Sequence, residues 1–144
     1  MDNQTLSKIQ KLIEVDGQLI VDEFYDSLLH ASPDLAHIFR NSDLTEQKKR
    51  LKDGLESILA LQTNPQELSH YLEDLGIRHI AYEVDAVHYP LVKEALVKAL
   101  ENHAKIENIS WPHFVDSIIE PMKHGAQNAV SYTHLRAHET LMNL

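Results

Sequence analysis

Apolar residues recur every three or four positions along most of the chain, which is the period of an α-helix with one buried face. No stretch alternates between apolar and polar residues for long enough to predict a strand. We therefore predict an all-α fold. The apolar stripes lie within residues 5–15, 21–29, 44–59, 68–79, 88–103 and 114–122.

Signals for helix ends divide these stripes into separate elements. Gly17 stands between the first two stripes. Ser32 followed by Pro33 is typical of a helix start and predicts a short helix that ends near Phe39. Asp43, with a glutamate three residues later, predicts a capped helix that extends to about residue 62.

Composition narrows the class of protein. With 144 residues, 43% of them hydrophobic and 24% charged, the chain is expected to form one globular domain. Its formal net charge of −9 argues against nucleic acid and anionic membranes as partners. No apolar run approaches the roughly 18 residues of a membrane span, and the N-terminus lacks the apolar region of a signal peptide. We predict a cytoplasmic location.

The absence of cysteine excludes a class of sites. There are no cysteines in the chain. Disulfides, thiolate metal sites and cofactors attached through cysteine, such as bilins, are therefore excluded.

The C-terminal segment differs in origin from the rest. Residues 130–140, VSYTHLRAHET, resemble the translation of a sequencing-library transposon adapter. We therefore predict that the domain comprises residues 1–129 and that residues 130–144 are not part of the fold. Within the last predicted helix, Pro121 is unusual and should kink or end it.

Three polar residues interrupt the apolar stripes. His79 continues the stripe that begins at Leu68, Gln47 falls between two leucines of its stripe, and Tyr25 follows Phe24. Each has an ordinary explanation when taken alone. An inward histidine is more often a hydrogen-bonded core residue than a ligand, a glutamine at a stripe edge is commonly half-exposed, and a buried tyrosine often bonds a carbonyl.

Their arrangement resembles the bacterial globins of the flavohaemoglobin and single-domain haemoglobin group. The strongest local match is LGIRHIAYEVDAVHYPLV, residues 75–92, in which His79 stands at the position of the proximal histidine. In that family, as here with Tyr82, Tyr89 and Pro90, a tyrosine follows in a short loop and a Tyr-Pro pair opens the next helix.

A second match surrounds the SPDL sequence at residues 32–35. It leads to Phe39, at the position of the haem-stacking phenylalanine of globins. The same alignment places Tyr25 at the distal tyrosine position and Gln47 at the distal glutamine position. The resemblance covers about residues 5–122 and implies a globin fold.

The resemblance further implies haem b, held between the helix of Gln47 and the helix of His79. It implies that His79 is the iron's protein ligand. Gln47 is a poor iron ligand, so we do not expect it to bind the iron as well. Arg50 and Arg78 could meet the haem propionates at the rim. The expected cofactor-binding residues are His79, Phe39, Tyr25, Gln47, Arg50, Leu51, Leu55, Leu75, Arg78, Val84, Tyr89, Val92 and Leu96.

The implied function is binding of dioxygen, and also of nitric oxide and carbon monoxide, at a five-coordinate iron. Tyr25 and Gln47 could donate hydrogen bonds to a ligand that gains negative charge. Nitric oxide dioxygenase activity would need a separate reductase, because the length leaves no room for a flavin or nicotinamide domain.

Two alternatives stay open at this point. One is a haem gas-sensor domain from a longer signalling protein, and the other is a globin-fold module without haem. The chain also departs from the family pattern, which pairs the tyrosine at position 89 with a carboxylate of the last helix. Asp116 and Glu120 are the candidates for that carboxylate.

Overall fold

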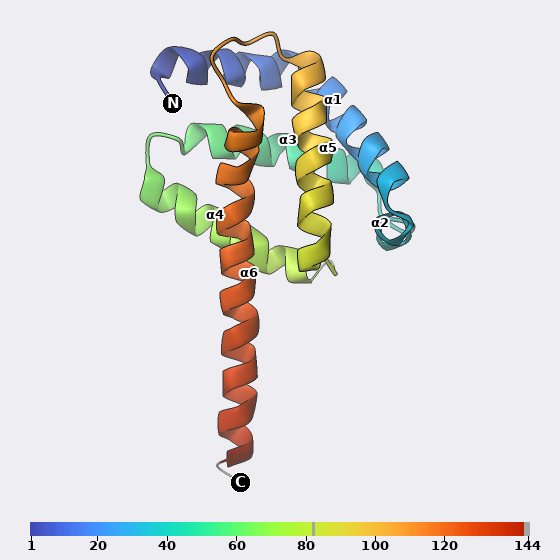
Figure 1. Ribbon diagram of the computed structural model, residues 1–144, viewed down its shortest axis with the longest axis vertical. Coiled ribbons are helices and arrows are strands. Elements are labelled where there is room, and N and C mark those ends of the chain that lie inside the picture. Colours follow the sequence, from blue (N-terminus) through green and yellow to red (C-terminus); the bar gives the residue numbers. More distant parts are fainter. Residues whose placement is uncertain (82, 143–144) are drawn as a thin grey trace.

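The computed structural model describes residues 1–81 and 83–142, with side chains for residues 1–81 and 83–129. In this part of the chain the regular elements are all helices, which confirms the predicted all-α class. Figure 1 shows their arrangement. The elements are α1 (Asn3–Ala31), α2 (Pro33–Ile38), α3 (Leu44–Ala60), α4 (Pro65–Ile80), the 3-10 helix η1 (Ala86–His88), α5 (Tyr89–His103) and α6 (Trp111–Met142).

The predicted capping residues begin their helices. The Ser32 hydroxyl accepts a hydrogen bond of 3.2 Å from the backbone N–H of Leu35 at the start of α2. The Asp43 carboxylate accepts one of 3.2 Å from the backbone N–H of Glu46 at the start of α3. Each bond satisfies one of the N–H groups that a helix start leaves without an intrahelical partner.

Two expected interruptions do not separate helices. Gly17 is buried inside α1, which continues through it although Figure 1 shows a change of direction between its first and second halves. Pro121 lies inside α6, and that helix continues to Met142 instead of ending at the proline. Tertiary packing around both positions overrides the local helix-breaking preference of glycine and proline.

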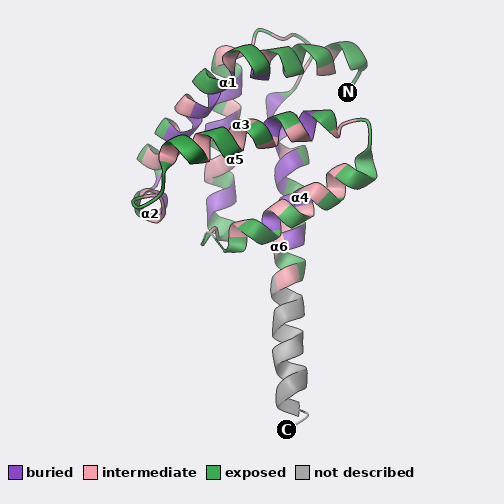
Figure 2. Ribbon diagram, turned by 180° about the vertical axis from the view of Figure 1, so that it is seen from behind, coloured by how far each residue is buried: buried purple, intermediate pink, exposed green. Residues whose placement is uncertain are grey.

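The helices pack in a way that leaves α3 and α4 on the same side of the molecule. α5 packs against both α1 and α6, α3 packs against α1, and α4 packs against α6. Seen from behind, α3 and α4 lie in front of α5 and α6, and all four helices contain buried residues (Figure 2). The residues that could line a ligand site therefore come from elements far apart in sequence.

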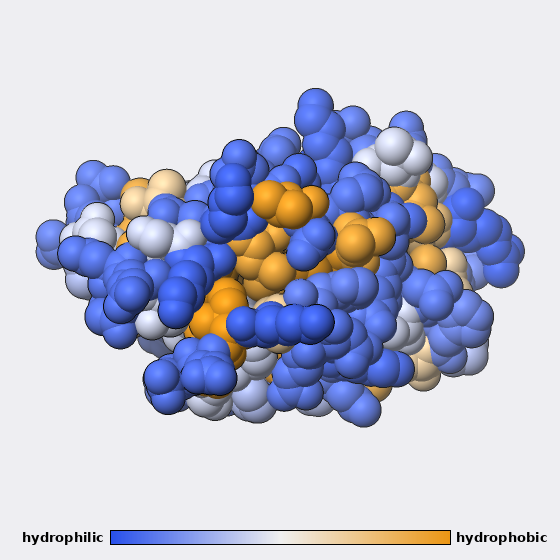
Figure 3. All heavy atoms as spheres, turned by 90° about the horizontal axis from the view of Figure 1, so that it is seen from above, coloured by the Kyte–Doolittle hydropathy of each residue, from blue (hydrophilic) through white to orange (hydrophobic). Residues whose placement is uncertain are grey.

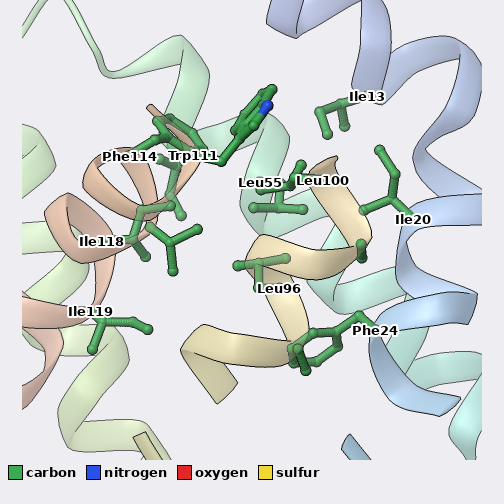
Figure 4. Packing of buried hydrophobic residues seen from close by; sticks show 14 of the residues in the cluster. Ile13, Ile20, Phe24, Leu55, Leu96, Leu100, Trp111, Phe114, Ile118 and Ile119 are labelled. Carbon is green, nitrogen blue, oxygen red and sulfur yellow. The ribbon is translucent and has the colours of Figure 1, made fainter. Parts of the chain in front are cut away.

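The core lies mainly between α1, α5 and α6. Ile13 and Ile20 of α1, Leu100 of α5 and Trp111 of α6 point toward one another (Figure 4). Viewed from the end of the molecule at which α1 begins, the surface is mainly hydrophilic, with groups of apolar residues between hydrophilic ones (Figure 3). Among the described residues, no helix is both long and apolar enough to span a membrane.

Candidate functional site

A cavity of about 810 Å³ lies inside the helical fold, and residues from α1, α3, α4, α5 and α6 line it. This volume falls within the range of roughly 300–1,000 Å³ that is typical of cofactor sites. The lining includes every one of the thirteen residues named from the sequence. The structure thus brings together His79, Phe39, Tyr25, Gln47, Arg50, Leu51, Leu55, Leu75, Arg78, Val84, Tyr89, Val92 and Leu96.

His79 lies in the last turn of α4, half-buried at the cavity wall. Its Nδ1 is 2.7 Å from the carbonyl oxygen of Leu75, one turn earlier. A carbonyl can only accept, so Nδ1 must carry the proton, and the lone pair of the neutral ring is on Nε2. Burial lowers the pKa of His79, and the neighbouring Arg78 charge acts in the same direction. Both effects favour the neutral ring that a metal requires.

The turn after His79 returns the chain to the cavity. The backbone N–H of Val84 donates to the carbonyl oxygen of His79 over 3.2 Å, and that of Glu83 donates to Ile80 over 3.0 Å. Glu83 adopts a left-handed backbone with φ of 64°, which is uncommon for a residue with a side chain. This tight turn places Val84 in the cavity lining. Tyr82, which the family match includes, lies outside the described residues.

Tyr25 is a buried residue with a polar hydroxyl at the cavity wall. The residue is 7% exposed, and its hydroxyl forms no hydrogen bond with another described residue. Its ring packs edge-on against Phe24 and Phe39, with centroid distances of 5.0 and 5.6 Å. Burial raises the pKa of Tyr25 to about 12, so the group is a neutral O–H donor at ordinary pH. Among the described residues, the only fully buried side-chain oxygen or nitrogen without a hydrogen-bond partner is Oε2 of Glu23. The Tyr25 oxygen is therefore accessible to a small molecule in a space that the residue lines.

Gln47 and Arg50 project from the first half of α3. Gln47 is half-buried, and its side-chain amide forms no hydrogen bond within the part of the chain that is described. Arg50 is exposed and lies 3.5 Å from the Glu46 carboxylate. Arg78, on α4, is also exposed and also lines the cavity. The two guanidinium groups therefore mark the edge of the cavity at which it meets solvent.

Part of the cavity lining, above all the contribution of α6, was not predicted from the sequence. Ile118, Ile119 and Met122 are buried residues of that helix and line the cavity together with Phe24 and Tyr71. Figure 4 shows Ile118 and Ile119 on α6, with Leu96 of α5 nearby. Their helical periodicity was visible in the sequence, but periodicity identifies a buried face without indicating what that face contacts.

Neither candidate carboxylate of α6 pairs with Tyr89. The Asp116 carboxylate lies 2.9 Å from the ammonium of Lys93, and that of Glu120 lies 3.4 Å from Lys123. The Tyr89 residue is 5% exposed, and burial raises the pKa of its hydroxyl. The expected family pairing is therefore not formed by these two side chains.

His88, which was assigned no role from the sequence, connects two elements of the fold. It is 3% exposed, and its Nδ1 accepts a hydrogen bond of 2.9 Å from the backbone N–H of Asp85. The proton must then be on Nε2, which donates to the Asp34 carboxylate over 2.9 Å. The bond joins η1 to α2, the short helix that leads to Phe39.

A second hollow of about 530 Å³ lies between α1 and the start of α3. Tyr25 lines both spaces, but the second hollow contains charged residues, including the ion pair of 3.0 Å between Asp22 and Lys48. None of His79, Phe39 and Gln47 reaches it. We therefore assign the candidate site to the larger cavity.

A family model described as Globin matches residues 22–122, which is more than half of the chain. The chain belongs to the globin family. This result confirms the resemblance inferred from the motifs and also the fold class. The matched region includes every residue of the candidate site, from Tyr25 to Leu96, together with the first part of α6.

Curated relatives of this globin include two proteins called flavohemoprotein. The one from Rhizobium meliloti (strain 1021) is 30% identical over 87 residues, covering 59% of this chain and 22% of the relative. The one from Bacillus subtilis (strain 168) is 26% identical over 109 residues, covering 71% and 27%. A globin-like protein from Aquifex aeolicus (strain VF5) is 28% identical over 90 residues, covering 62% and 64%.

The globin thus spans about a quarter of the length of the flavohemoproteins that it matches. Membership of the family implies haem binding and diatomic ligands in general.

Proposed function

We propose that this globin holds haem b with His79 as the protein ligand of the iron, and binds dioxygen and other diatomic gases between the iron and the side chains of Tyr25 and Gln47. One observation carries the proposal. A neutral histidine and two polar groups that form no hydrogen bond with another described residue line the same cavity, and the three residues come from three different helices.

The lining residues fit the chemistry of haem. A flat apolar macrocycle needs apolar walls, and leucines such as Leu51, Leu55 and Leu96 supply them. The haem carboxylates need water or cations, and Arg50 and Arg78 are exposed at the cavity edge. The hydrogen bond from Nδ1 of His79 to Leu75 fixes the tautomer and the orientation of the ring, as outer partners of metal-bound histidines usually do.

When bound, haem would supply an iron atom that takes a ligand from the protein, here His79, and that can bind a diatomic gas. Tyr25 and Gln47 would direct an O–H and an N–H donor at that gas. Because the pKa of Tyr25 is about 12, the hydroxyl keeps its proton at neutral pH. Hydrogen bonds in such a low-dielectric cavity are stronger than in water, so they favour gases that gain negative charge.

The experiment that tests this proposal is an absorption spectrum of the purified chain reconstituted with haemin. We expect a Soret band, stoichiometric haem, a five-coordinate ferrous form, and spectral changes with dioxygen and with carbon monoxide. If titration of the protein with haemin gave no Soret band change that reaches saturation, haem binding would be contradicted. A six-coordinate ferrous spectrum without added ligand would contradict the open site.

Nitric oxide dioxygenase activity is the second part of the proposal, and it depends on a separate reductase. The support is the pair of donors, which would retain dioxygen long enough to meet nitric oxide. The test is nitrate formation after nitric oxide is mixed with the oxygenated protein, first in a single turnover and then with a reductase added. If nitric oxide disappears no faster than in free solution, this part of the proposal is wrong.

A further inference from the structure

The helices α4 and α6 touch backbone to backbone at two glycines. A methyl group built on Gly76 would lie 1.9 Å from the carbonyl oxygen of Met122. In the other direction, a methyl group on Gly125 would lie 2.4 Å from the carbonyl oxygen of Glu73. Contacts under 3.0 Å are essentially absent for real side-chain Cβ atoms. Each helix therefore contributes a glycine at which the other helix's backbone occupies the space of a side chain.

This crossing lies next to the candidate site from both sides. Gly76 precedes His79 by three residues, so the contact is one turn from the imidazole on the same helix. On α6, the residue in contact is Met122, whose side chain lines the cavity. The backbone contact thus sets the distance between α4 and α6 at the point where both helices contribute to the cavity.

We propose that Gly76 and Gly125 are positioning residues for His79, and that their close crossing sets the position of the imidazole relative to the haem. The inference rests on the proposed haem site. Replacement of either glycine by alanine requires α4 and α6 to separate by about 1 Å or more in the case of Gly76, and by less for Gly125. Functional groups must be held within roughly 0.5 Å to work, so this displacement is large for a metal ligand.

The glycines elsewhere in the chain provide a contrast. The atoms nearest to a methyl group on Gly17 would belong to the flexible side chain of Lys52, with Cε at 2.9 Å. That side chain can move, whereas a backbone carbonyl in a packed helix moves only with its helix. Gly17 lies in α1 and does not line the cavity. Gly17→Ala is therefore the matched control.

The test is Gly76→Ala in the full chain, examined without haem and after reconstitution. We expect the melting temperature of the haem-free protein to fall. In the ferrous protein, we expect the iron–histidine stretching band in the resonance Raman spectrum to shift. We also expect haem transfer to an excess of apomyoglobin to become about tenfold faster, which is the change in rate that an overpacking strain of typical size would cause. Gly17→Ala should leave both the band and the transfer rate unchanged.

Gly125→Ala provides a second reading in case Gly76→Ala folds poorly. Its predicted overlap is smaller, so we expect the same shift of the iron–histidine band with a smaller amplitude. A folded Gly76→Ala or Gly125→Ala protein with a lower melting temperature but an unchanged band and haem-transfer rate would overturn the proposal. The crossing would then serve stability alone. Failure of the wild-type chain to bind haem would instead contradict the proposed function, and the two failures are thus distinguishable.

Discussion

On the wall of the cavity formed by α4 and α6, the imidazole of His79 is 2.7 Å from the Leu75 carbonyl, and the helices meet through glycine backbones. On the wall formed by α1 and α3, the Tyr25 hydroxyl and the Gln47 amide form no hydrogen bond with another described residue. The first wall holds its functional group in one orientation, while the second leaves two donors available. Such a division suits a cofactor ligand on one side and an exchangeable gas on the other.

The largest expected effect comes from the wall of α4 and α6. His79→Ala should abolish normal haem ligation, because within the described residues no other histidine lines the cavity. The readouts are the Soret spectrum and the rate of haem loss. His70→Ala is the matched control, since His70 is an exposed residue of the same helix outside the cavity. Spectra of His79→Ala that match the wild type would remove His79 from the site.

A smaller effect is expected on the wall of α1 and α3. Tyr25→Phe removes the hydroxyl but keeps the ring that packs against Phe24 and Phe39. Loss of one hydrogen bond to a partly charged acceptor costs about 1.5–3 kcal/mol, so oxygen dissociation should be about tenfold to a hundredfold faster. Stopped-flow measurement of oxygen release tests this. Carbon monoxide, which is less polar when bound, should respond less, and equal changes for both gases would indicate steric effects instead.

Gln47→Leu sharpens the same comparison. The substitution removes the amide of α3 and keeps a side chain of similar size, so oxygen release should again accelerate. Because both donors would address one ligand, the effects of Tyr25→Phe and Gln47→Leu should not add in the double variant. Dissociation rates of the four proteins in the cycle give the coupling. Strictly additive effects would mean that the two groups act on separate sites.

The two walls also differ in how far the sequence could predict them. Helical periodicity together with the resemblance to bacterial globins was sufficient to name thirteen residues that line one cavity. They were not sufficient to place Ile118, Ile119 and Met122 there, because an apolar stripe does not reveal its partner. The His88–Asp34 bond joins residues 54 positions apart, and only the folded chain brings them together.

Helix ends were predictable where a side chain caps the backbone locally, as at Ser32 and Asp43. They were not predictable where packing decides. Gly17 and Pro121 both favour an interruption by their backbone chemistry, yet α1 and α6 continue through them. Local preference of this size is readily overcome by the burial of a long apolar face.

The pH dependence of oxygen release tests whether Tyr25, on the wall of α1 and α3, keeps its hydroxyl proton at alkaline pH. Burial raises its pKa from 10.0 to about 12 because the charged phenolate is poorly solvated in the cavity. The folded protein therefore retains the Tyr25 proton between pH 10 and 12, where the unfolded chain loses it. The contribution of this group to the free energy of unfolding is fully present below pH 10 and is lost as pH rises toward 12. Oxygen dissociation should stay constant from pH 8 to 10.5. Acceleration near pH 10 that is absent from Tyr25→Phe would show that the hydroxyl titrates normally and is solvated.

The smallest effect is expected from the end of the chain, which lies beyond both walls. The cavity lining ends at Met122 and the glycine crossing at Gly125, while the resemblance to a translated adapter covers residues 130–140. In Figure 1, α6 runs on past the other helices toward Met142. Because we predict that this segment is not part of the fold, we expect it to contribute little to the stability of the domain. A chain that ends at Ala129 should therefore keep the melting temperature and Soret spectrum of the longer chain. If its free energy of unfolding fell by several kcal/mol, or if haem were lost, the segment would have to be counted as part of the working domain.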